Sequence, residues 1–178
     1  QEKKILIDGG GDWCTNYDPG ERIIAPFFRF FGYKQIDNII LTHAHYNHYL
    51  GLKYIMANYP VENFYTNASF ADEPDYLILS ELAKQKKVCT EIVSAISEKT
   101  YGPVKLSFYW PPYITNKEDD NSIVTRMVYH QFRILFPADI DQDAQRELAA
   151  KVPDLHSDIL IAPNHGTDKL DDSFLQAV

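Results

Sequence analysis

The chain has 178 residues, 45% of them hydrophobic and 24% charged. This length suits one domain of ordinary size, and the apolar share is too high for a disordered tail. No window approaches the ~18 uncharged apolar residues that a membrane-spanning helix needs. Lys and Arg number 17 against 25 Asp and Glu, a formal charge of −8. A fully basic nucleic-acid surface is therefore disfavoured, because phosphate binding depends largely on Lys and Arg, although a local basic groove stays open.

The ends and the cysteines say little about location. Cys14 and Cys89 belong to no CxxC pair and are too few for a disulfide framework. The sequence begins with Gln1 and shows no charged-then-apolar leader, so we interpret it as a mature product or an excised domain. Because its first segment already predicts a strand, an earlier strand missing from the sequence is an open alternative. A cytoplasmic domain and the extracytoplasmic part of a membrane-tethered protein both remain possible.

The first third of the chain predicts alternating strands and helices. A strand at residues 5–7 runs into D-G-G-G, where glycines mark a tight turn. Residues 25–32 predict a short helix with a proline in its first turn and a glycine at its end. Residues 37–41 predict a buried strand that ends in T-H-A-H-Y-N-H, and residues 50–58 have helical spacing.

The rest of the chain predicts further strands and helices, and no repeat or linker interrupts it. The elements expected are an amphipathic helix at 74–87, a strand at 104–110, a hairpin from 122–129 and 132–136, a helix at 141–151 and a buried strand at 158–162. This order predicts sheets covered by helices, in an α/β or α+β layer arrangement. We expect a single domain over residues 1–178.

Three of the six histidines fall within six residues, at His43, His45 and His48. If the extended backbone of the preceding strand continues through residues 43–45, the first two imidazoles point the same way, as one metal ion requires. His48 then lies on the next turn, where it can approach a second ion. Imidazoles suit zinc and other divalent transition metals. The alternative interpretation is three exposed histidines in a loop.

Two later segments favour the metal interpretation. Asp139 follows a predicted strand in F-P-A-D, and a carboxylate at a strand end can bridge two ions. His165 lies in P-N-H-G-T, the loop after another predicted strand. Each has a simpler explanation by itself, since Asp139 is also placed to cap the helix at 141–151 and His165 to serve as a turn residue.

Several motifs follow one another in a characteristic order: L-I-D-G-G at Asp8, T-H-A-H-Y-N-H, F-P-A-D and P-N-H-G-T. The runs A-P-F-F-R-F-F-G-Y-K-Q-I-D-N-I-I-L-T, W-P-P, D-N-S-I-V-T-R and S-F-L-Q-A-V accompany them. Together they resemble the metallo-β-lactamase superfamily, most closely the C-terminal hydrolase-like domain of competence DNA-uptake proteins of the ComEC type. The resemblance extends from about Ile5 to Val178. It implies a four-layer αββα sandwich, with a metal site along one edge of the paired sheets, and a metal-dependent hydrolase.

The resemblance also implies a ligand set. His43 and His45 would hold the first ion, and His48 and His165 would hold the second. Asp139 would bridge the two ions.

Other residues receive supporting roles from the same resemblance. Asp8 would fix the loop without binding metal, and Asn121 and Asn164 are expected beside the ligands. The family's third histidine of the first site falls in the stretch 119–122, D-D-N-S, so the ligand that replaces it stays open.

Three positions depart from the family pattern. Asn47 stands where the family has an aspartate that holds the second ion and orients the attacking hydroxide. An amide oxygen is neutral and a poor zinc ligand, although hard cations such as calcium and magnesium accept it. Asn164 replaces a histidine, and Ala138 replaces a glycine. Because these changes fall at the site while the scaffold motifs persist, they indicate an altered metal preference or a degenerate site.

The leading hypothesis is a hydrolase of the phosphodiesterase or nuclease type that activates water with one or two Zn or Mn ions. Asp139 and Asn47 are expected to carry the catalytic roles. The substrate would be a small phosphoester or a single-stranded nucleic acid, although the charge of −8 counts against long nucleic acids. The rival hypothesis is a catalytically silent metal-binding or interaction module. A nucleic-acid binder without chemistry is the third, and it predicts salt-dependent binding. His130 and His156 are expected to face solvent.

Overall fold

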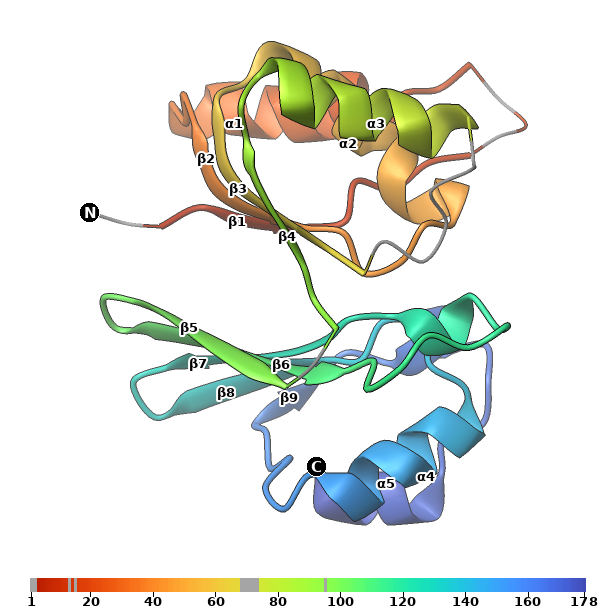
Figure 1. Cartoon of the computed structure of the whole chain (residues 1–178). Coiled ribbons are helices and arrows are strands. Elements are labelled where there is room, and N and C mark those ends of the chain that lie inside the picture. The colour runs from red at the N-terminus through yellow and green to blue at the C-terminus, as the bar shows by residue number, and fades with distance from the viewer. Residues whose placement is uncertain (1–2, 13, 15, 68–73, 95) are drawn as a thin grey trace. The chain divides into compact units, whose positions relative to one another are not determined.

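The computed structural model describes residues 3–178 except 13, 15, 68–73 and 95. The chain forms two compact units, Gln1–Ile92 and Val93–Val178, and each contains one sheet with its own helices (Figure 1). Two sheets with helices confirm the predicted mixed α/β class. The expectation of one domain over residues 1–178 stays a prediction.

The sheet of the first unit is entirely parallel. Its strands lie in the order β1-β2-β3-β4, and these are Ile5–Ile7, Ile36–Ile40, Val61–Thr66 and Cys89–Ile92. Every residue of β2 is buried, including the polar Asp37 and Asn38, as expected for a central strand of a parallel sheet. Because parallel strands end at the same edge, the residues after β1 and after β2 become neighbours. The backbone N–H of Asp8 accordingly donates to the carbonyl of Ile40 at 2.9 Å.

The helices of the first unit lie on one face of this sheet (Figure 1). They are a π-helical turn η1 at Gly20–Ile24, followed by α1 at Ala25–Phe31, α2 at Tyr46–Asn58 and α3 at Pro74–Gln85. The core between helices and sheet is built from fully buried side chains, including Ile39, Leu52, Ile55, Met56, Phe64 and Leu79. The predicted helix at 25–32 is confirmed, and Gly32 ends it with a left-handed backbone at φ 69°.

The sheet of the second unit is mixed. Its strands lie in the order β5-β6-β7-β8-β9, and these are Ser97–Tyr101, Val104–Trp110, Val124–Tyr129, Phe132–Phe136 and Ile159–Leu160. Strands β5 to β8 are antiparallel neighbours, whereas β9 runs parallel to β8. The predicted hairpin is therefore confirmed as β7 and β8, with the exposed His130 in its turn.

Two helices pack on this second sheet, α4 at Gln142–Lys151 and α5 at Asp172–Ala177. Leu135, Leu148 and Phe174 are fully buried between the helices and the strands. Two short 3₁₀ turns, η2 at Asp119–Asn121 and η3 at Pro163–Gly166, belong to the loops of this unit.

Several sequence predictions of elements were incomplete. The buried strand expected at 158–162 is wrong in length and burial, because β9 has two residues at the sheet edge, and Ile159 and Ile161 are 41% and 47% exposed. The sequence analysis did not predict β3, β4, β5 or α5. Among the described residues, no helix has both the length and the apolar character that crossing a bilayer demands.

Candidate metal centre

The three clustered histidines lie where β2 ends and α2 begins. His43 is in the short loop after β2, His45 is the residue before the first turn of α2, and His48 lies within that first turn. The helix thus begins at Tyr46, four residues before the predicted start. His48 is consequently held by helical backbone rather than by a loop, which fixes the direction of its side chain.

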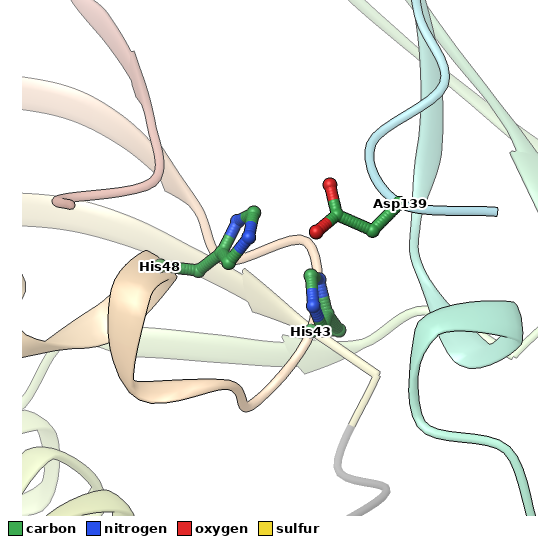
Figure 2. A group of neighbouring side chains, drawn as sticks. All are labelled: His43, His48 and Asp139. Atoms are coloured by element: carbon green, nitrogen blue, oxygen red, sulfur yellow. The ribbon is translucent and has the colours of Figure 1, made fainter. Parts of the chain in front are cut away.

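The imidazoles of this cluster converge. Nε2 of His43 lies 3.0 Å from Nδ1 of His45, and the rings of His43 and His48 have centroids 4.1 Å apart (Figure 2). His43 is fully buried, and His48 is 5% exposed. The interpretation as three exposed loop histidines is therefore wrong. Two ring nitrogens that face each other at 3.0 Å either share a proton or bind one cation, so this donor set fits a divalent transition metal.

Asp8 anchors this cluster from the neighbouring strand. It follows β1 with a left-handed backbone at φ 58°. Its carboxylate accepts hydrogen bonds from the backbone N–H and the hydroxyl of Thr42, each at 2.8 Å, and its Oδ2 lies 2.8 Å from Nδ1 of His48. A carboxylate behind a ligating histidine fixes the ring and its tautomer. The supporting role expected of Asp8 stays a prediction, and these contacts favour it.

Thr42 is a site residue that the sequence analysis missed. It is 2% exposed, and its hydroxyl lies 3.1 Å from Nδ1 of His43 as well as bonding Asp8. Its place directly before the H-A-H triplet was the available signal.

Asn47 lies in the first turn of α2, next to His48 in the sequence, and is half-buried.

The second unit brings Asp139 and His165 together. Asp139 lies in the loop after β8, and its side chain projects from that loop (Figure 2). The residue is 5% exposed. Its Oδ2 lies 3.2 Å from Nε2 of His165, and its backbone N–H donates to the hydroxyl of Ser122 at 3.3 Å. Asp139 does not cap α4, because Asp141 does so by accepting from the N–H groups of Asp143 and Ala144. The carboxylate of Asp139 contacts His165 instead of the first N–H groups of α4.

The loop that carries His165 has a strained backbone. Asn164, His165 and Gly166 have φ values of 45°, 54° and 76°, a left-handed run that disfavours residues with a Cβ. Such strain often accompanies functional sites. The side-chain amide of Asn164 donates to Asp168 at 2.6 Å, so Asn164 holds its own loop.

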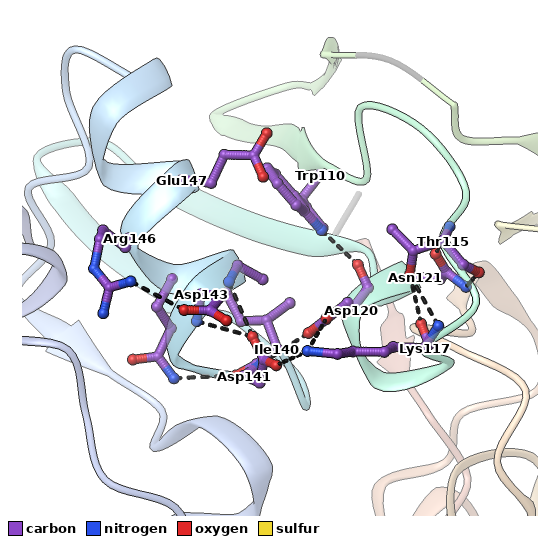
Figure 3. Close-up of polar contacts among 12 residues, drawn as sticks. Trp110, Thr115, Lys117, Asp120, Asn121, Ile140, Asp141, Asp143, Arg146 and Glu147 are labelled. Atoms are coloured by element: carbon purple, nitrogen blue, oxygen red, sulfur yellow. Dashed lines mark hydrogen bonds and ion pairs between the residues drawn. The ribbon is translucent and has the colours of Figure 1, made fainter.

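Asn121 and its surroundings stabilise the segment beside Asp139 (Figure 3). The fully buried Asn121 side chain accepts from the backbone N–H of Thr115 at 2.7 Å and donates to its carbonyl at 3.0 Å. The ammonium group of Lys117 lies 2.6 Å from Asp141 and 3.4 Å from Asp120. The indole N–H of Trp110 donates to the carbonyl of Asp120 at 2.6 Å. This network ties the loop before β7 to the start of α4.

The two carboxylates of this network have opposite pKa shifts. Burial raises the pKa of Asp120, and the nearby charge of Asp141 adds to the rise. Burial also acts to raise the pKa of Asp141, but hydrogen bonds from Lys117 and from the N–H of Ala144 outweigh it and lower the pKa overall. Asp120 belongs to the stretch 119–122, where the family has the third histidine of the first metal site. Its carboxylate contacts Lys117 and the backbone N–H of Asp141. His156 is exposed, as expected.

Comparisons with known proteins agree with this fold. A family model described as the metallo-beta-lactamase superfamily matches residues 1–166. ComE operon protein 3 of Bacillus subtilis (strain 168) is 24% identical over 179 residues, which cover 94% of this chain and 23% of that protein. The chain thus spans less than a quarter of that curated relative.

Two solved structures share the fold at low sequence identity. A Cronobacter sakazakii metallo-β-lactamase with a HARLDQ motif, in its S60 mutant form, has a TM-score of 0.61 at 14% identity and covers 88% of this chain and 66% of its own. Zn²⁺-bound PqqB from Methylobacterium extorquens has a TM-score of 0.53 at 12% identity and covers 88% of this chain and 54% of its own. With two sheets, a buried histidine cluster and a family match over most of its length, the chain belongs to the metallo-β-lactamase superfamily.

Proposed function

We propose that this chain is a metal-dependent hydrolase that acts on a phosphodiester. The observation that carries the proposal is the buried convergence of His43 and His48, with His45 facing His43 at 3.0 Å. Nε2 of His43 and Nδ1 of His45 face each other at a separation at which both lone pairs can be offered to one cation. A cation that binds their lone pairs gives these residues a reason to converge.

The proposed ligands are those that the family resemblance implies. His43 and His45 would hold a first ion, and His48 and His165 a second, with Asp139 between the ions. Within the first unit, support comes from Asp8, which orients His48 at 2.8 Å. Within the second unit, support comes from the 3.2 Å approach of Asp139 to His165. Imidazole and carboxylate donors suit Zn or Mn, and the fold likeness to Zn²⁺-bound PqqB favours zinc among the two.

The chemistry divides between the metal and the side chains. A bound divalent cation supplies Lewis-acid activation of water and of a phosphoryl oxygen. Asp139, which is 5% exposed, would hold the cations through its carboxylate oxygens. Asn47 can orient a water molecule through its amide, but it adds no negative charge and cannot accept a proton as a general base. We therefore expect catalysis to be slower than in relatives that carry aspartate at this position.

The substrate class that we propose is supported by the likeness to ComE operon protein 3 and by charge. The sequence resembles competence DNA-uptake proteins, which favours a phosphodiester substrate such as single-stranded DNA. The formal charge of −8 favours small phosphoesters or short strands over long nucleic acids.

A catalytically silent metal-binding module is the second candidate. The observation that favours it is the pair of neutral amides, Asn47 and Asn164, at positions where the family has an acid and an imidazole. The side chain of Asn164 is already bonded to Asp168 at 2.6 Å. The second ion would then be weakly held or absent, while the first could remain.

Metal content and hydrolysis separate these candidates. Purified native chain, His45→Ala and Asn47→Asp are analysed for bound metal and assayed with bis-p-nitrophenyl phosphate and single-stranded DNA, in the presence of Mn or Zn. Hydrolysis by the native chain that disappears in His45→Ala supports the enzyme. Hydrolysis that appears only in Asn47→Asp supports the silent module. His130→Ala, an exposed turn histidine, is the matched control and should behave as the native chain.

A further inference from the structure

The hydroxyl of Thr42 lies between the carboxylate of Asp8 and the ring of His43. Its Oγ1 is 2.8 Å from Oδ2 of Asp8 and 3.1 Å from Nδ1 of His43. Thr42 is 2% exposed and His43 is fully buried, so these contacts form away from bulk water. The backbone N–H of Thr42 also donates to the carboxylate of Asp8. This second hydrogen bond fixes the position of Thr42 relative to that carboxylate.

The donor and acceptor capacities of these groups set the direction of each bond. An ionised carboxylate only accepts, so the single hydrogen of the Thr42 hydroxyl points to Asp8. The oxygen of that hydroxyl then offers lone pairs to Nδ1 of His43, and a favourable contact at 3.1 Å requires that Nδ1 carry the proton. A neutral imidazole has one N–H, so Nε2 of His43 keeps its lone pair.

The carboxylate of Asp8 also contacts the ring of His48 directly. Oδ2 of Asp8 lies 2.8 Å from Nδ1 of His48, against 3.4 Å for Oγ1 of Thr42, so Asp8 is the acceptor for this ring. Asp8 therefore reaches two imidazoles, His48 directly and His43 through one hydroxyl group.

We propose that Thr42 is a positioning residue that relays the Asp8 carboxylate to His43 and holds that ring in the Nδ1–H tautomer, with Nε2 presented for metal. Only the metal-affinity part of this inference rests on the proposed function. The tautomer is a property of the metal-free chain and involves the first unit alone.

Two measurements test the relay. In the first, ring-nitrogen NMR of the ¹⁵N-histidine-labelled, metal-free native chain reports the tautomer of His43. We expect Nδ1–H in the native chain and in Thr42→Ser, and a shift toward Nε2–H in Thr42→Val, whose methyl group accepts no hydrogen bond. A native His43 in the Nε2–H tautomer overturns the proposal, even if no variant folds.

The second measurement is calorimetric affinity for Mn and Zn. Thr42→Val should bind about 10-fold to 100-fold more weakly, the range for loss of a group that orients a ligand, while Thr42→Ser should stay within about threefold of the native chain. The matched control is Thr66→Val, because Thr66 is an equally buried threonine, at the end of the adjacent strand β3 and 3.0 Å from the hydroxyl of Tyr76. Thr66→Val should bind metal as the native chain does. Equal losses in Thr42→Val and Thr66→Val, or none in Thr42→Val, overturn the relay. A native chain that binds neither metal refutes the proposed function and leaves the NMR result to decide the relay.

Discussion

The backbone N–H of Asn164 donates to the carbonyl of Ala138 at 2.9 Å, and both residues have a left-handed backbone, at φ 45° and 53°. This bond joins the loop that carries His165 to the loop that carries Asp139. Two side chains 26 positions apart in the sequence are therefore aligned by a main-chain contact. The family places glycine at position 138, where the left-handed backbone would carry no steric cost.

Replacing Ala138 with glycine should stabilise the chain. A left-handed residue with a Cβ costs about 1–2 kcal/mol, and glycine removes this cost. Glycine also gives the unfolded chain more conformational freedom, which offsets about 0.4–1 kcal/mol of the stabilisation. We expect the free energy of unfolding of Ala138→Gly to rise by about 0.5–1 kcal/mol in urea titrations. Ala150→Gly, the same change at an exposed position of the right-handed α4, should instead lower it by about 0.5 kcal/mol. A destabilised Ala138→Gly would show that its backbone strain is smaller than its geometry implies.

Replacing Gly51 with alanine should destabilise the first unit. A Cβ at Gly51 would collide with the carbonyl oxygen of Gly9 and the backbone nitrogen of Gly20, and backbone atoms cannot move aside as side chains do. We expect a loss of about 3 kcal/mol in urea unfolding. Metal affinity should fall as well, because the N–H of Gly9 donates to the carbonyl of His48 at 2.6 Å.

Gly102→Ala is the control for this collision. Gly102 has a left-handed backbone at φ 59°, and no neighbouring atom lies within 4 Å of the added carbon. The substitution therefore costs only the strain of a left-handed backbone and causes no collision. It should cost about 1 kcal/mol and leave metal affinity unchanged. Equal destabilisation by the two variants would contradict close packing at Gly51.

The stability of the first unit should depend on pH through Asp37. Burial acts to raise the pKa of this carboxyl group, but hydrogen bonds from Lys3 at 2.8 Å and from the backbone N–H of Lys4 at 2.8 Å lower it below its ordinary value of 3.8. A folded-state pKa below the unfolded one stabilises the fold above the unfolded pKa. That contribution is lost as the pH falls through the folded-state value.

Asp37→Asn should therefore be less stable than the native chain at pH 7, by about 1 kcal/mol after allowance for the partly exposed Lys3. The difference between the two chains should shrink as the pH falls below about 4, since the native carboxyl group then takes up its proton. Urea midpoints at pH 7, 5 and 3 measure this. A difference that stays constant over the series would place the Asp37 pKa at its ordinary value.

Removing Lys117 should loosen the network at the start of α4. In Lys117→Met, Asp120 and Asp141 face each other without their shared cation, so the melting temperature should fall and the fall should diminish in 1 M salt. Adding Asp120→Asn to Lys117→Met should restore part of the loss because one of the two charges is gone. The control is Lys105→Met, which removes a single exposed ion pair with Glu98 and should change the melting temperature little. Equal falls for the two lysine variants would show that the network adds nothing beyond one surface pair.

Local sequence signals predicted the regular parts of the fold well. The apolar residues that end β2, the glycine after α1 and the periodic pattern of α3 are each local signals of a few residues. The structure has each element near its expected bounds. Strands β3, β4 and β5 were missed because their residues alternate polar and apolar only weakly and gain stability from pairing with distant neighbours. The two-residue β9 is likewise defined by its register with β8.

The residue types of the candidate site can be read from local sequence patterns: three clustered histidines, an acid and a later histidine, each after a predicted strand. The groups that orient those donors are known from the three-dimensional packing, because they come from distant parts of the sequence. Asp8 and His48 are 40 positions apart, and they meet because parallel strands end at one edge of a sheet. The approach of Asp139 to His165 likewise depends on two left-handed loops. Hydrogen bonds of this kind follow from how the chain packs, and no local sequence pattern encodes them.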